Sequence, residues 1–105
     1  MKTFSEKVVE LALSIPKGKV TTYGRIAVAA GGGSMASRSV TAILGKAYKA
    51  GEHDIPFHRI VYADGSAWMK GEYRKKRTEL YKKEGIKIDK QDRIGNFRDV
   101  LFEFE

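Results

Sequence analysis

The chain has 105 residues, 42% of them hydrophobic, so we expect one domain (1–105) around a single core. No apolar run approaches the roughly 18 residues of a membrane span, and residues 1–14 alternate charged with apolar side chains, unlike a signal peptide. The absence of cysteine excludes disulfides, thiolate metal sites and thiol nucleophiles. We therefore expect a soluble protein of the cytoplasm that holds no metal and no cofactor.

Basic residues outnumber acidic ones by 20 to 13, and this excess is concentrated in the first half of the chain. Residues 1–50 hold eight basic and two acidic residues, whereas residues 51–105 hold twelve and eleven. A basic face on the N-terminal half is expected to bind a polyanion such as nucleic acid. A basic composition also serves solubility alone in many small domains.

Residues 1–30 predict two helices. Thr3 and Glu6 form a capping box before a helix whose apolar residues recur at helical spacing, and Pro16 ends that helix. Thr21 or Thr22 is the N-cap of a second, short helix over 23–30.

Residues 31–48 complete a helix-turn-helix pattern. Three glycines at 31–33 supply the turn, and Ser34 or Ser37 caps a longer helix that runs to about Tyr48. The first turn of this helix carries small residues and Arg38, which suits close approach to a DNA groove. An αα-hairpin with no role in DNA binding has the same pattern.

The second half predicts an extended segment over 55–62, a turn at 63–65 and a charged helix over 72–84. Leu80 and either Tyr73 or Tyr81 are expected to face inward on that helix. Residues 100–104 alternate apolar and acidic side chains, as in a strand or a packed extension. We predict a mainly helical, winged-helix-like DNA-binding domain with a helix-turn-helix and one short strand-like segment.

The segment Pro56–Val61 (PFHRIV) resembles the active-site motif Pro-Cys-His-Arg-Val of O6-alkylguanine-DNA alkyltransferases, with Phe57 in place of the cysteine. An aromatic residue there resembles the alkyltransferase-like proteins, which usually carry Trp at that position. Val20–Ala27, Ala36–Val40 and Glu84 with the glycine that follows it match further family segments in the same order. The separate N-terminal domain of many transferases has no counterpart in this sequence.

The resemblance implies a DNA-binding role for four residues. Arg38 matches the arginine finger that enters the base stack from the minor groove and fills the gap left by a flipped nucleotide. Tyr23 matches the tyrosine that crowds the 3′ phosphate of that nucleotide and lines its pocket. Ala36 and Ser37 match the small residues that let the recognition helix lie in the minor groove.

The resemblance also implies a lesion pocket formed by Tyr23, Phe57, Trp68 and Lys70. His58 and Glu84 match the pair that activates the cysteine in the transferases, and we expect them to remain as a buried, hydrogen-bonded pair with no catalytic role. Phe57 has no lone pair with which to accept an alkyl group. The implied protein is a monomer that binds O6-alkylguanine in double-stranded DNA without repairing it and marks it for nucleotide excision repair proteins.

Two other functions remain open at this stage. A helix-turn-helix transcriptional regulator would read base edges in the major groove of an undamaged site. An enzyme would use His58 and Glu84 for hydrolysis or for a second dealkylation chemistry.

Overall fold

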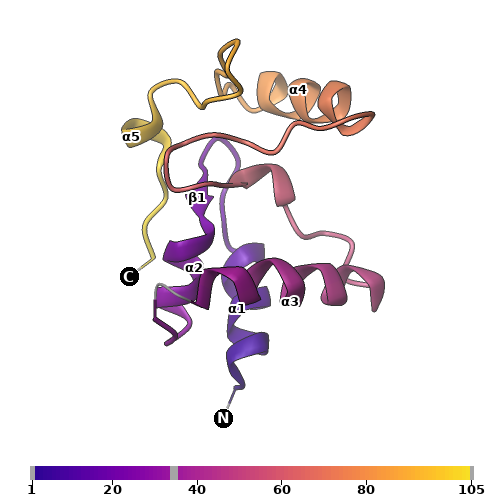
Figure 1. Ribbon diagram of the computed structural model, residues 1–105, viewed down its shortest axis with the longest axis vertical. Helices are drawn as coiled ribbons and strands as arrows, with labels where there is room; N and C mark the ends of the chain where they lie inside the picture. The colour runs from indigo at the N-terminus through magenta and orange to yellow at the C-terminus, as the bar shows by residue number, and fades with distance from the viewer. Residues whose placement is uncertain (1, 34–35, 105) are drawn as a thin grey trace.

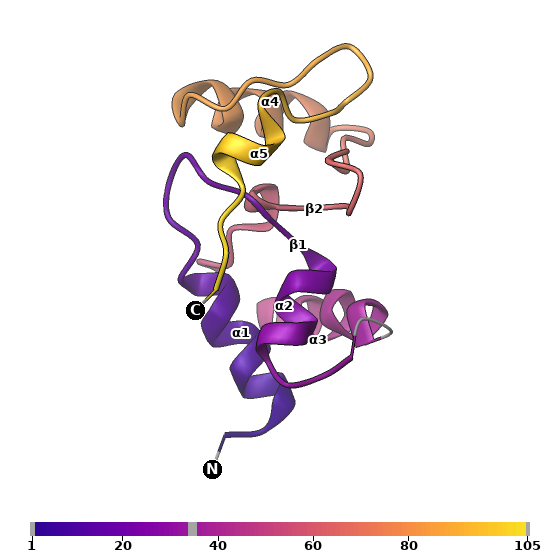
Figure 2. The same cartoon turned by 90° about the vertical axis from the view of Figure 1, so that its left-hand side faces the viewer.

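Two hydrophobic cores, stacked along the longest axis, organise the computed structural model, which describes residues 2–33 and 36–104 (Figures 1 and 2). Helices dominate, as predicted, and within the described residues none is long and apolar enough to cross a membrane. In chain order the elements are α1 (Phe4–Leu13), β1 (Thr21–Thr22), α2 (Tyr23–Ala29), α3 (Ser37–Lys49), η2 (Phe57–Arg59), β2 (Ile60–Val61), α4 (Tyr73–Lys83) and α5 (Phe97–Val100).

The first core lies among α1, α2 and α3 at the lower end of the molecule in Figure 2. The predicted capping box opens α1, with the Thr3 hydroxyl accepting from the Glu6 amide and the Glu6 carboxylate accepting from the Thr3 amide. Apolar side chains at helical spacing then turn inward and become fully buried: Val8, Ala12, Ile26, Ala27, Val40 and Leu44. Helical spacing in the sequence predicted three of these residues, Val8, Val40 and Leu44.

Helix α3 begins differently from the prediction. Its N-cap is Ala36, with no side-chain hydrogen bond, and Ser37 is the first residue of the helix instead of its cap. Ser34, the other predicted cap, lies outside the described residues. Ala36 carries no side-chain oxygen, so it cannot accept from the backbone N–H groups of the first turn.

Strands β1 and β2 pair in parallel between the two cores, with Thr21 opposite Ile60 and Thr22 opposite Val61. Side chains alternate along a strand, so Ile60 enters the first core and Val61 the second. Thr22 ends β1 and caps α2, since its hydroxyl accepts from the Arg25 amide at 3.1 Å, as predicted.

Residues 57–59 form one 3₁₀ turn, where the sequence predicted an extended segment. In an extended chain His58 and Arg59 would point to opposite faces. The turn lets both side chains reach the same partner, the carboxylate of Glu84. A tertiary ion pair therefore overrides the local preference at this point.

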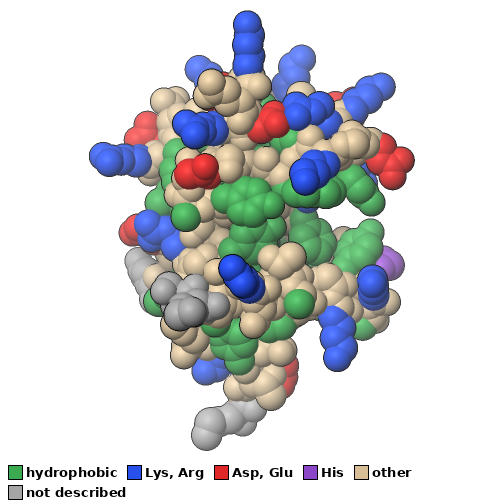
Figure 3. All heavy atoms as spheres, viewed as in Figure 1, with side chains coloured by type: hydrophobic (Ala, Val, Ile, Leu, Met, Phe, Trp, Pro, Cys, Tyr) green, Lys and Arg blue, Asp and Glu red, His purple; other side chains and the backbone are tan. Residues whose placement is uncertain are grey.

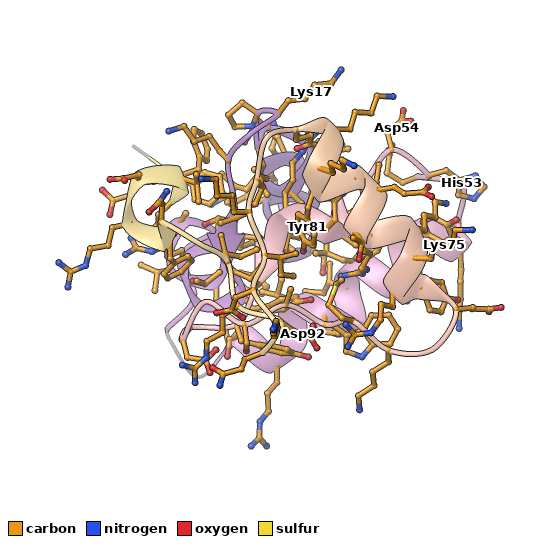
Figure 4. The ribbon with its side chains drawn as sticks, turned by 90° about the horizontal axis from the view of Figure 1, so that it is seen from above. Lys17, His53, Asp54, Lys75, Tyr81 and Asp92 are labelled. Atoms are coloured by element: carbon orange, nitrogen blue, oxygen red, sulfur yellow. The ribbon has the colours of Figure 1, made fainter. Side chains whose placement is uncertain are left out.

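The second core lies beneath α4, where Tyr81 is fully buried and Leu80 is half-buried. Tyr81 thus faces inward as predicted, whereas Tyr73 at the start of the helix remains 51% exposed. In the view from above, Tyr81 lies near the centre of the molecule and Lys17, His53 and Asp54 lie at its edge (Figure 4).

The C-terminal segment is a packed extension. The Val20 amide donates to the Val100 carbonyl at 2.9 Å, and the Phe102 amide donates to the Val20 carbonyl at 2.7 Å. Phe102 and Phe104 then pack against the first core. The segment crosses from the upper to the lower part of the molecule (Figure 1) and ties the two cores together.

Replacing Gly32 by alanine should destabilise the turn between α2 and α3. A Cβ atom at this position would lie 2.8 Å from Phe4 Cε1 and 3.0 Å from Ala36 Cβ, closer than normal packing allows. We expect Gly32→Ala to lower the free energy of unfolding by about 1–3 kcal/mol in urea titrations. Gly24→Ala in α2 is the matched control, because its Cβ would meet nothing within 4 Å. An equal loss of stability in both variants would contradict the crowding argument.

Candidate nucleotide-binding cleft and DNA-binding face

The carboxylate of Glu84, at the end of α4, accepts four hydrogen bonds from two distant segments, the turn at 57–59 and Gly18. Arg59 donates to it twice, Nε to Oε1 and Nη2 to Oε2, each at 2.9 Å. His58 Nε2 lies 2.6 Å from Oε2, and the Gly18 amide donates to Oε1 at 3.1 Å. Arg59 Nη1 also donates to the Ile15 carbonyl at 2.9 Å, which anchors the end of α1. The predicted His58–Glu84 hydrogen bond is therefore confirmed.

This network fixes the protonation of its members. Burial alone would raise the pKa of Glu84, but the hydrogen bonds from Arg59, His58 and Gly18 lower that pKa to about 2. Burial lowers the pKa of His58, although its hydrogen bond to Glu84 opposes the shift. Near neutral pH the imidazole is therefore uncharged, and its Nε2–H donates to an ionised carboxylate that can only accept.

Phe57, at the position matching the family cysteine, lines a cleft of about 560 Å³ between α3 and α4. The cleft opens between the upper and lower parts of the molecule, at the right in Figure 3, and hydrophobic side chains gather on its walls there. Its aromatic residues are Tyr48, Phe57 and Tyr73, and the Tyr48 ring meets the Phe57 ring edge-on at 5.8 Å. These rings offer a surface on which a base can stack.

The charged residues of the cleft are mostly cationic. Lys49, Lys76 and Arg77 line it, against one carboxylate, that of Asp54. The Arg77 guanidinium carbon lies over the Trp68 ring, 5.0 Å from its centroid. The Trp68 ring in turn packs on that of Tyr73, a residue of the cleft wall, with 5.3 Å between the ring centroids. The cleft therefore combines apolar walls with positive charge, a combination suited to a nucleotide.

The four residues of the sequence-derived pocket are not brought into one cavity. Only Phe57 lines the cleft, and Trp68 reaches its wall through Tyr73 and Arg77. Tyr23 is half-buried with its ring 5.8 Å from that of Tyr62. Lys70 is exposed in the segment before α4.

Three residues that line the cleft were not predicted from the sequence: Tyr48, Tyr73 and Arg77. Tyr73 and Arg77 are one helical turn apart on α4, so their spacing was a usable signal for one shared face. Tyr48 gave no such signal, because its approach to Phe57 depends on how α3 packs below the 3₁₀ turn. Arg59, the fourth residue of the motif at 56–61, has a structural role through its ion pair with Glu84.

The predicted DNA-binding residues lie at the starts of α2 and α3. Arg38 is exposed on the first turn of α3, while Ala36 and Ser37 are half-buried beside it. Tyr23 opens α2, the helix that packs most closely on α3. The start of α3 thus presents the small residues Ala36 and Ser37 beside the exposed Arg38.

Within residues 2–33 and 36–104 no group of three or more His, Asp or Glu side chains is arranged to hold a metal ion. The two histidines have different surroundings. His58 is hydrogen-bonded to Glu84, whereas His53 is exposed beside the Tyr48 ring.

Known proteins are similar to this chain in sequence and in fold. Residues 3–86 match the family model described as 6-O-methylguanine DNA methyltransferase, DNA binding domain. A protein of Vibrio parahaemolyticus named DNA base-flipping protein is 31% identical over 95 residues, which cover 90% of this chain and 92% of that protein.

Two solved structures extend the comparison. The structure of S. pombe Atl1 in complex with damaged DNA containing O6-carboxymethylguanine superposes with a TM-score of 0.70 at 26% identity, covering 99% of this chain and 100% of that one. A variant of the M. tuberculosis O6-methylguanine methyltransferase superposes with a TM-score of 0.59 at 27% identity, covering 80% of this chain and 49% of that one.

Replacing Glu84 by glutamine should remove an acid-sensitive part of the stability. The pKa of Glu84 is about 2 in the folded protein against an ordinary value of 4.5, so the network stabilises the fold fully above pH 4.5 and is lost as the pH falls toward 2. We expect Glu84→Gln to cost about 3 kcal/mol near pH 7, and this difference from the unmodified protein to shrink as the pH falls through that window.

Urea unfolding between pH 7 and about pH 2 measures this effect. Glu79→Gln, which removes an exposed carboxylate from the same helix, is the control and should leave the pH profile unchanged. A Glu84→Gln profile parallel to that of the unmodified protein would show that the network does not contribute to acid sensitivity.

Proposed function

Because the chain belongs to the family of the 6-O-methylguanine DNA methyltransferase DNA-binding domain, we propose that it binds double-stranded DNA, flips an O6-alkylated guanine into the cleft beside Phe57 and leaves the alkyl group in place. It acts as a damage-recognition protein and not as an enzyme. The marked site is handed to nucleotide excision repair proteins.

The observation that carries this proposal is the aromatic ring of Phe57 beside an otherwise retained polar network. The histidine and glutamate that would activate a thiol are hydrogen-bonded at 2.6 Å, yet the neighbouring residue is Phe57 and the sequence contains no cysteine. A phenyl ring offers no atom to receive an alkyl group, but it offers a face for stacking. The site is therefore suited to holding a modified base.

The DNA would be held by the edge formed by α2 and α3. Small residues at Ala36 and Ser37 permit close approach of α3 to the minor groove, and the exposed Arg38 is free to enter the base stack. Flipping a nucleotide costs roughly a few kcal/mol, and stacking on an aromatic wall returns about 1–3 kcal/mol per base. Electrostatic attraction to the basic N-terminal half adds to this.

The relatives support the same function. The Vibrio protein is named for base flipping, and Atl1 was crystallised with DNA that contains an O6-alkylated guanine. A sequence-specific regulator of undamaged DNA would need no aromatic cleft behind its helix-turn-helix, so this alternative leaves the cleft unexplained.

A comparison of two duplexes, with guanine or O6-methylguanine at one position, tests the proposal. We expect tighter binding of the modified duplex in fluorescence-anisotropy titrations, and we expect Arg38→Ala to weaken that binding by about 1–3 kcal/mol because the flipped state loses its stacking partner. Thermal unfolding of Arg38→Ala should be unchanged, since the side chain is exposed. Equal affinity of the unmodified protein for both duplexes would refute recognition of the lesion.

Replacing Phe57 by cysteine tests whether the Phe57 ring binds the lesion or only occupies the place of a missing nucleophile. We expect weaker binding of the O6-methylguanine duplex, by about 1–3 kcal/mol, because the ring is removed from the cleft. We also expect little or no alkyl transfer in intact-mass spectra, because near-attack geometry tolerates little error. Phe57→Leu is the control that keeps an apolar group without a ring. Undiminished affinity would contradict stacking, and stoichiometric transfer would show a working transferase site.

A further inference from the structure

One arginine in the cleft has a buried nitrogen with no partner. Arg77, on α4, lines the cleft that contains Phe57, and its Nη1 atom is buried without donating a hydrogen bond to any described residue. The Tyr81 hydroxyl, one helical turn further along α4, is also buried without a hydrogen-bond partner among the described residues, and the charge of Arg77 opposes the rise that burial causes in its pKa. Buried polar groups are nearly always hydrogen-bonded, so such a pair requires an explanation.

Two other arginines in this part of the molecule donate hydrogen bonds to carboxylates. Arg59 makes a two-point ion pair with Glu84, and Arg74, three residues before Arg77, makes one with Asp92. Arg77 instead rests on the Trp68 indole, which holds the plane of the guanidinium without engaging its N–H groups. The contact with Trp68 therefore orients the guanidinium, and among the described residues its Nη1 atom has no acceptor.

Arg77 also lies among the residues that surround Phe57 in the fold. Burial raises the pKa of the Tyr23 phenol, and the charge of Arg77 opposes that rise. Burial lowers the pKa of His58, and the charge of Arg77 adds to that effect. Arg77 and Phe57 line the same cleft.

We infer that Arg77 is a specificity-determining residue, whose guanidinium donates a hydrogen bond to N1 of the flipped O6-alkylguanine. This inference rests on the proposed function and adds the atoms that are read. Guanine carries a hydrogen on N1, and alkylation at O6 removes it, so that N1 becomes an acceptor. A guanidinium has donors only and keeps its charge. At N1 it therefore finds an acceptor in the alkylated base and a second donor, the N1–H group, in unmodified guanine.

The mismatch with guanine gives the discrimination its physical basis. A donor that faces another donor in a water-poor cleft loses its hydrogen bond to water and gains none in return. Sites built around such a pair reject the wrong ligand more strongly than apolar contacts do. The cation–π contact with Trp68 keeps the donor in place for this comparison.

The test is the ratio of affinities for O6-methylguanine and guanine duplexes, measured by anisotropy titration for three proteins. Arg77→Met keeps an apolar stem over Trp68 and removes the donors, and we expect it to lower the ratio by roughly tenfold or more. Lys76→Met is the matched control, because it removes a neighbouring cation that also lines the cleft. It should weaken both duplexes alike and leave the ratio unchanged.

The outcomes are separable. A ratio in Arg77→Met equal to that of the unmodified protein, or an equal loss on both duplexes as for a phosphate contact, overturns the inference while the proposed function stands. A ratio near one in the unmodified protein overturns both. If Arg77→Met fails to fold in thermal unfolding, Arg77→Lys carries the same comparison, because lysine keeps the charge but lacks the planar fork and should also lower the ratio.

Discussion

The ionised carboxylate of Glu84 links segments of the chain that lie far apart in the sequence. It accepts from Arg59 and His58 on the 3₁₀ turn and from the Gly18 amide after α1, so that three segments meet at the end of α4. Gly18 has φ of +83°, a conformation that glycine adopts without the strain of a side chain and that directs its N–H to the carboxylate. Such a buried ion pair is costly to break, because either partner would be left as an unpaired charge.

That anchor explains why a cleft exists between the two cores. The 3₁₀ turn is fixed by Glu84 above and by the Ile15 carbonyl below, and Phe57 stands at the start of this turn. The loop from α3 then enters the turn from one side, and α4 closes over it from the other (Figure 2). The walls of the cleft therefore belong to elements that this polar network and the Tyr48–Phe57 ring contact hold in place.

The same network gives His58 and Glu84 a structural role. Both side chains are joined to Arg59 through the Glu84 carboxylate, and the sequence contains no thiol for them to activate. Phe57 itself is half-buried, and a substitution there leaves the polar network untouched. Phe57 lines the cleft, and the residues that follow it, His58 and Arg59, join the polar network that stabilises the fold.

The sequence by itself determined the features that depend on near neighbours. Helical spacing gave α1 to α4 to within a few residues, the Thr3–Glu6 pair gave the first cap, and the motif at 56–61 gave the family. Tertiary structure alone decided the rest. The 3₁₀ turn, the docking of 100–104 on Val20, and the meeting of Tyr48, Phe57 and Arg77 all join residues far apart in the chain. Local propensity carries no information on such contacts, because they depend on how the helices pack and on which buried charge finds its partner.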